Sequence, residues 1–146
     1  IIGCGIGFYR EKKKNLILNI NDLKLITEFP VLENLSNEKL EYWYKSLKIL
    51  SQGALDNIEG DVSLLMIGNI DKTCKMNFID NFKNSFNSIE TSITEDLLDA
   101  IKYKNIILII SLMVTSKDEL NAITNKLSNQ KNNILGLIIL PDLIKT

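Results

Sequence analysis

The stretch IILIISLM, residues 106–113, is the strongest indication of the fold. It is an unbroken run of large, mostly branched side chains, which is typical of a strand that is buried on both faces. Similar but shorter runs occupy residues 62–67 and 134–140, and a weaker one occupies residues 89–93. Segments of helical spacing lie between the runs. This alternation predicts an α/β fold, with a mainly parallel sheet covered by helices and joined by right-handed crossovers.

The helices between these runs are predicted from spacing and capping residues. Phenylalanine and isoleucine recur at helical spacing over residues 78–86. Thr94 is expected to cap a second helix. Ser116 and Glu119 fit a capping box for a third, in which a hydroxyl and a carboxylate each satisfy a free backbone N–H.

Two short helices are expected before residue 61. Asn21 is a suitable cap for the first, which Pro30 would end, and Ser36 or Asn37 would cap the second. The second carries three consecutive aromatic residues, 42–44, and helical spacing places two of them in the core. A contact surface is the alternative for these aromatic side chains.

Composition restricts the classes of function. The chain has 146 residues, which suggests one domain, and its net charge of −1 gives no bulk basic field for nucleic acid. It contains no histidine, which removes the commonest general base and most zinc sites. Cys4 and Cys74 are far apart and lack a CxxC spacing, which favours a reducing compartment. We expect no metal site and no cofactor.

The first residues favour a membrane location. Residues 1–8 are apolar, and Arg10 and three lysines at 12–14 follow at once. Eight residues are too few to span a bilayer, which needs about 20, but they fit the end of a transmembrane helix whose basic flank lies in the cytoplasm. A short apolar strand or helix of a soluble protein is the alternative. The expected organisation is a helix end and basic segment (1–15), a helical linker (16–60) and an α/β domain (61–146).

The turn after the first long strand resembles a phosphate-binding loop in part. Such a loop reads GxxxxGK[ST]: its glycines allow the backbone to wrap phosphates, and its hydroxyl holds magnesium. Gly68 opens the turn, and aligning Lys75 with the motif lysine places Asn69 and Cys74 at the glycines and Met76 at the hydroxyl. Methionine offers no oxygen to magnesium. We interpret these five residues as a vestigial nucleotide loop, with an ordinary strand–helix turn as the alternative.

The order of these parts resembles the cytoplasmic end of bacterial polysaccharide co-polymerases. These are chain-length determinants, and the tyrosine autokinases fused to them, that act in capsule and exopolysaccharide export. In that family a transmembrane helix with a glycine-rich, basic end precedes a short helix, a PVLG phrase, an E-x-[FY]-R-x-L-R helix and a P-loop domain. Residues 3–8 look like the helix end, Pro30-Val31-Leu32 looks like the phrase, and residues 133–138 look like the family's VLGVVLN strand.

The resemblance also implies a self-association helix. Tyr44, Lys45, Leu47 and Lys48 are similar to the F-R-x-L-R core, with lysines in place of both arginines. The family then implies a homo-oligomer at the bacterial inner membrane, with the domain in the cytoplasm and with polysaccharide polymerase or export proteins as partners.

Several parts of the family's catalytic machinery are missing. There is no Asp-x-Asp after a strand, no apolar run that ends in aspartate and no tyrosine-rich tail. The span between the loop and residue 106 is also too short for the family's middle strands, so we expect one strand–helix unit to be lost. We therefore expect a degenerate P-loop NTPase-like, pseudokinase-like module with no catalytic residue, acting in chain-length control or export. Two alternatives stay open: a divergent P-loop ATPase or tyrosine autokinase that uses Lys75, and a soluble α/β binding module unrelated to polysaccharide.

Overall fold

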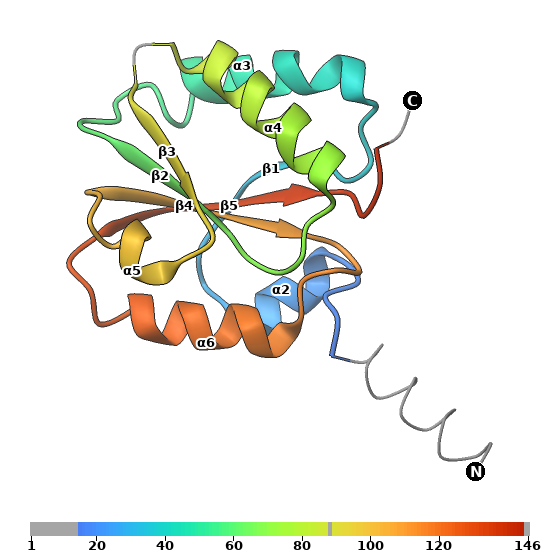
Figure 1. The fold of residues 1–146 in the computed structure, drawn as a ribbon, viewed down its shortest axis with the longest axis vertical. Helices are drawn as coiled ribbons and strands as arrows, with labels where there is room; N and C mark the ends of the chain where they lie inside the picture. Colours follow the sequence, from blue (N-terminus) through green and yellow to red (C-terminus); the bar gives the residue numbers. More distant parts are fainter. Residues whose placement is uncertain (1–14, 88, 145–146) are drawn as a thin grey trace.

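The computed structural model describes residues 15–87 and 89–144, which form one five-stranded sheet with helices on both faces (Figure 1). All the strand pairs of the sheet are parallel, in the order β1-β5-β4-β2-β3, so the expectation of a mainly parallel α/β sheet is confirmed. The strands are β1 (Val31–Asn34), β2 (Val62–Met66), β3 (Thr91–Thr94), β4 (Asn105–Ser111) and β5 (Asn133–Leu140).

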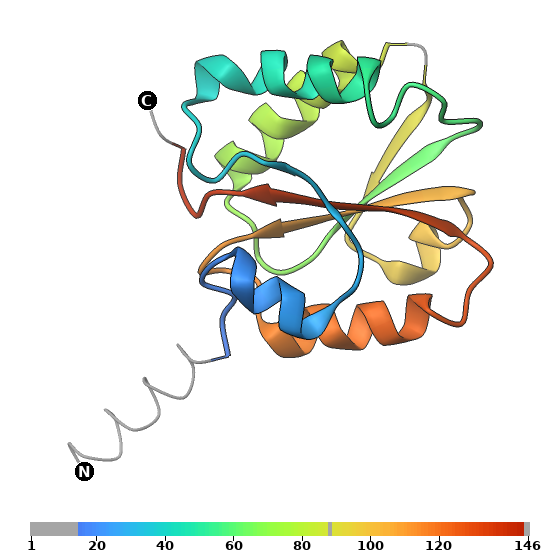
Figure 2. The same cartoon turned by 180° about the vertical axis from the view of Figure 1, so that it is seen from behind.

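The helices form a layer on each side of the sheet. In Figures 1 and 2, α3 and α4 lie on one side of it, while α2, α5 and α6 lie on the other. The two hydrophobic cores have the same division, since α3 and α4 contribute to one core and α2, α5 and α6 to the other. The helices are α2 (Ile20–Ile26), a 3-10 turn η1 (Leu40–Tyr42), α3 (Trp43–Gln52), α4 (Lys72–Ser85), α5 (Leu97–Ala100) and α6 (Lys117–Leu127).

The central strands are buried on both faces, as their apolar sequences predict. Along β2, Leu64 and Met66 pack in the core under α3 and α4, whereas Leu65 packs in the opposite core. This alternation follows from the two-residue period of a strand. Every residue of β2 and β4 is buried, so these two strands form the centre of the domain.

The segment 16–60, expected as a helical linker, contributes a strand to the sheet as well as helices. β1 pairs in parallel with β5, and Trp43 of α3 is fully buried in the core beside α4. The sequence analysis missed β1 because its four residues, VLEN, are only half apolar and all partly exposed. Burial on both faces, the feature that revealed β2, β4 and β5, does not apply to this edge strand.

The expected helix starts in this segment were misplaced. Asn19, not Asn21, caps α2, because its side-chain oxygen accepts a hydrogen bond from the N–H of Asp22. α3 starts later than Ser36 or Asn37 predicted, after the 3-10 turn, and has no side-chain cap. Of the three aromatic residues 42–44, only the middle one is buried, so the expectation of two core positions was wrong by one.

The later helix starts were predicted better. The capping box of α6 is confirmed, since the Ser116 hydroxyl accepts from the N–H of Glu119 and the Glu119 carboxylate accepts from the N–H of Ser116. The helix expected from Thr94 is only four residues long and is capped by Asp96, whose carboxylate accepts from the N–H of Leu98.

The expected end of a transmembrane helix falls on residues 1–15, of which the structure describes only Asn15. Within residues 15–87 and 89–144, no helix combines the length and the hydropathy needed to cross a bilayer.

Candidate functional site

The best candidate site is the carboxyl edge of the sheet beside β2. The chain runs from β2 to β3 on one side and then to β4 on the other, so the strand order reverses at β2. In open parallel sheets, ligands bind outside the carboxyl ends of the strands at such a reversal. The five residues of the expected nucleotide loop all lie here, in the turn after β2 and the first turns of α4.

The turn itself is too short to wrap a phosphate group. β2 ends at Met66 and α4 begins at Lys72, so most of the eight motif positions, residues 69–76, already belong to the helix. The N–H of Lys75 donates to the carbonyl of Asp71 at 2.9 Å in a regular helical bond. Backbone N–H groups that are committed to the helix are not free to surround an anion.

The start of α4 already holds a carboxylate. Asp71 is the N-cap, and its Oδ2 accepts a hydrogen bond from the N–H of Cys74 at 3.1 Å. A helix N-terminus favours an anion because its free N–H groups and the helix dipole are positive there. The Asp71 carboxylate already occupies this position, so a phosphate that approached it would be repelled by a negative charge.

Lys75 is paired with a carboxylate from the neighbouring strand. Its Nζ lies 2.5 Å from Oε1 of Glu95, which follows β3. Exposed pairs of this kind are worth about 0–1 kcal/mol, so the pair adds little to stability. Its effect on binding is more direct, because an incoming phosphate has to compete with Glu95 for the only lysine of the motif.

Thr115, from the turn between β4 and α6, fills the space beside the loop. Its hydroxyl donates to the carbonyl of Ile67 at 2.7 Å and accepts from the N–H of Ser111 at 3.0 Å. Gly68 has φ +91°, and a Cβ placed on it would lie 3.0–3.1 Å from atoms of Thr115. The crevice between β2 and β4 is therefore occupied by the chain itself, and Gly68 is required for this close contact.

Cys74 and Met76 offer no reactive group to a substrate. The Cys74 side chain is fully buried, with its Sγ 3.8 Å from the carbonyl oxygen of Pro141. Burial raises the pKa of this thiol to about 11, and the nearby carboxylates of Asp71 and Asp142 add to the shift. The thiol is therefore protonated at neutral pH and is not a nucleophile. Met76 is exposed, but a thioether is a poor ligand for magnesium.

The four residues expected to mediate self-association do not share one surface. Tyr44 and Lys45 are exposed and Lys48 is half-buried, but Leu47 is fully buried in the core under α3. Leu47 therefore belongs to the core of the domain, and Tyr44, Lys45 and the exposed part of Lys48 are the members of this set that lie on the surface. The sequence analysis also missed Ile49, a large apolar residue that is exposed on the same helix.

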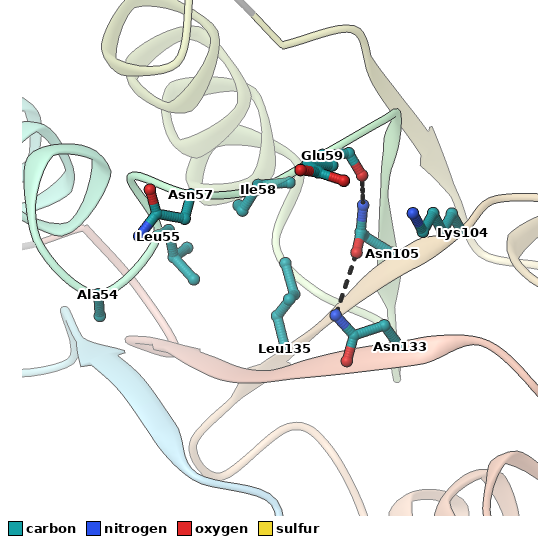
Figure 3. A pocket seen from close by; sticks show the side chains of 9 residues that line it. All are labelled: Ala54, Leu55, Asn57, Ile58, Glu59, Lys104, Asn105, Asn133 and Leu135. Atoms are coloured by element: carbon teal, nitrogen blue, oxygen red, sulfur yellow. Dashed lines mark hydrogen bonds between the residues drawn. The ribbon is translucent and has the colours of Figure 1, made fainter.

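A pocket at the opposite, amino edge of the sheet, with polar and apolar lining residues, was also missed (Figure 3). Asn105 is nearly fully buried at its centre, and its Nδ2 donates to the carbonyls of Glu59 and Asp61. Its Oδ1 accepts a hydrogen bond from Nδ2 of Asn133. Asn105 thus ties together the amino ends of β2, β4 and β5, and these bonds give it a structural role. In the sequence, nothing about Asn105 at the start of β4 indicates that its side chain bonds to the neighbouring strand ends.

The chain matches no protein-family model, no curated protein and no solved structure. The geometry of the carboxyl edge and the order of sequence elements therefore carry the functional conclusion.

Proposed function

We propose that this chain is a non-catalytic cytoplasmic module of a bacterial inner-membrane protein that acts in polysaccharide chain-length control or export. The observation that carries the non-catalytic part is the occupation of the carboxyl edge by the protein's own groups. Asp71 takes the helix N-terminus, Glu95 takes Lys75, and Thr115 takes the crevice. A phosphate-transfer site needs these positions to be open.

The proposed ancestry is a P-loop NTPase-like domain that has lost its catalytic groups. Three features support it: the loop follows a central strand at the reversal of strand order, a helix begins directly after it, and Lys75 lies in the first turns of that helix. The link to polysaccharide rests on the order of sequence elements, from the apolar and basic segment 1–14 through Pro30-Val31-Leu32 to the helix with Tyr44, Lys45 and Lys48. The exposed part of that helix is proposed to contact a second copy.

The competing function is a divergent ATPase or autokinase that uses Lys75. It is favoured by the place of Lys75, whose partner Glu95 is largely exposed and so is easily displaced. The two functions make opposite predictions for the same substitution, which allows one experiment to separate them.

The experiment is complementation in the native bacterial host. Deleting the gene is expected to change the length distribution of surface polysaccharide, seen by gel electrophoresis. Both the wild-type gene and Lys75→Ala are expected to restore it equally, because Lys75 has no catalytic role in the proposal. Lys72→Ala, an exposed lysine of the same helix turn, is the matched control. An unchanged polymer after deletion would exclude the polysaccharide role, and failure of Lys75→Ala alone would favour the enzyme.

A further inference from the structure

We propose that the carboxyl edge of the sheet is the surface that this domain presents to a lipid bilayer. The inference rests on the membrane anchoring in the proposed function and adds an orientation to it. In a parallel α/β enzyme this edge would hold a ligand. In this domain we infer that it faces the membrane.

The first support is the point at which the chain enters the domain. Backbone hydrogen bonds join residues 15–17 to the turn between β4 and α6: Lys117 N–H to Asn15 O (2.6 Å), Ile17 N–H to Thr115 O (3.0 Å) and Met113 N–H to Ile17 O (2.8 Å). Ile17 is also fully buried. The chain therefore cannot leave this edge without breaking these bonds and exposing Ile17, so the entry point is fixed at the carboxyl edge.

The second support is the short distance along the chain to the apolar and basic segment. Six residues lie between Phe8 and Asn15, and an extended chain covers at most about 25 Å over these seven steps. With residues 1–8 in the bilayer, Asn15 and the turn bonded to it lie close to the headgroups. In Figure 1 the arrowheads of β4 and β5 point to the side where α2 begins and where the last described residues lie.

The third support is the distribution of exposed apolar side chains. Several large ones lie in the turns and first helix turns that follow the strands, or next to residue 17, with exposed fractions between 39% and 68%. Among the described residues, the loops that precede β2 to β5 carry no large hydrophobic side chain of comparable exposure. Leu25 and Ile49 are also strongly exposed, at 88% and 61%, but they lie in the later parts of α2 and α3, away from this edge. An end of a domain that is enriched in exposed apolar side chains suits an apolar partner. The exposed residues at the carboxyl edge are Leu18, Met76, Leu98, Met113 and Leu143.

Met113 has a backbone that holds its side chain in this exposed place. Its φ is +64°, a left-handed conformation that a residue with a side chain rarely adopts. The hydrogen bond from its N–H to Ile17 O fixes this turn against the entering chain. An exposed methionine at a strained turn, directly beside the entry point, is the residue expected to lie nearest to the bilayer.

The two ends of β4 provide a matched pair of positions for the test. Lys104 precedes the strand and Met113 follows it, and both are exposed. The seven residues of β4 rise about 3.3 Å each, so the two positions differ in height by roughly 20 Å. Met113→Cys and Lys104→Cys are made in a Cys4→Ser background. The buried thiol of Cys74 should take no label, which the background protein checks.

The experiment measures energy transfer from a label at each position to an acceptor on lipid headgroups. The full-length protein is reconstituted in vesicles of phosphatidylcholine with a minority of phosphatidylglycerol, and Trp43 emission verifies that each variant is folded. The label at position 113 is expected to transfer several-fold more efficiently than the label at 104. Equal transfer, or more transfer from 104, would overturn the orientation while leaving the anchoring intact. Protein that does not float with the vesicles would overturn the anchoring and the inference with it.

Discussion

Replacing Trp43 by alanine is expected to lower the free energy of unfolding by about 3–5 kcal/mol. The indole is fully buried in the core formed by α3, α4 and the sheet, and its Nε1 donates to the carbonyl of Glu38 at 3.3 Å. Removing it leaves a large cavity that the surrounding side chains fill only in part. Urea unfolding followed by circular dichroism measures the change, because Trp43 is the single tryptophan and fluorescence is lost with it.

The adjacent Tyr44 is the matched control. Tyr44 is 46% exposed, whereas Trp43 is 0% exposed, so Tyr44→Ala is expected to change stability by only about 0.5 kcal/mol. A small and similar effect of both substitutions would contradict the structure. It would mean that α3 belongs to a loosely attached linker and not to the core of the domain.

Replacing Gly136 by alanine is expected to cost about 3 kcal/mol, because two penalties add. Gly136 has φ +149°, which residues with a side chain avoid. A Cβ there would also lie 2.5 Å from Pro30 O and 2.7 Å from Cγ of Leu32, which is too close for either atom. The N–H of the next residue, Leu137, bonds to Pro30 O, so the clash falls where β5 meets the start of β1.

Gly60→Ala separates the two penalties. Gly60 also has a positive φ, +90°, but the nearest atom to its Cβ position is Cδ of Lys104 at 3.6 Å, which is an ordinary contact. Its expected cost is therefore backbone strain alone, about 1 kcal/mol. Urea unfolding followed by Trp43 emission measures both variants. If Gly136→Ala costs no more than Gly60→Ala, β1 does not pack against β5 as the structure has it.

The sequence predicted the elements whose residues carry strong local signals. The continuous apolar runs of β2, β4 and β5 gave these strands, and the Ser116–Glu119 capping box gave the start of α6 to the residue. β1 gave no such signal. Its place in the sheet depends on contacts with β5, more than 100 residues later in the chain.

The turn from β2 into α4 lies where the sequence predicted a strand-to-helix turn, but the contacts of its side chains were not visible in the sequence. The missing glycines and hydroxyl were evident at Asn69, Cys74 and Met76. The contact of Lys75 with Glu95 joins residues 20 positions apart, and that of Thr115 with Ile67 joins residues 48 apart. Such long-range contacts arise from the packing of the strands side by side, and a single sequence does not reveal them.

Calorimetric titration of the full-length protein with ATP and magnesium tests the central claim most directly. Lys75 alone offers one charge-assisted hydrogen bond, worth about 1.5–3 kcal/mol, whereas micromolar affinity needs about 8 kcal/mol. The carboxylates of Asp71 and Glu95 oppose the phosphates further. We predict no saturable binding at micromolar ATP in the wild type, Lys75→Ala or the control Lys72→Ala. The contradicting result is micromolar affinity in the wild type and in Lys72→Ala that is lost in Lys75→Ala. It would mean that the carboxyl edge is open to nucleotide and is not occupied by the protein's own side chains.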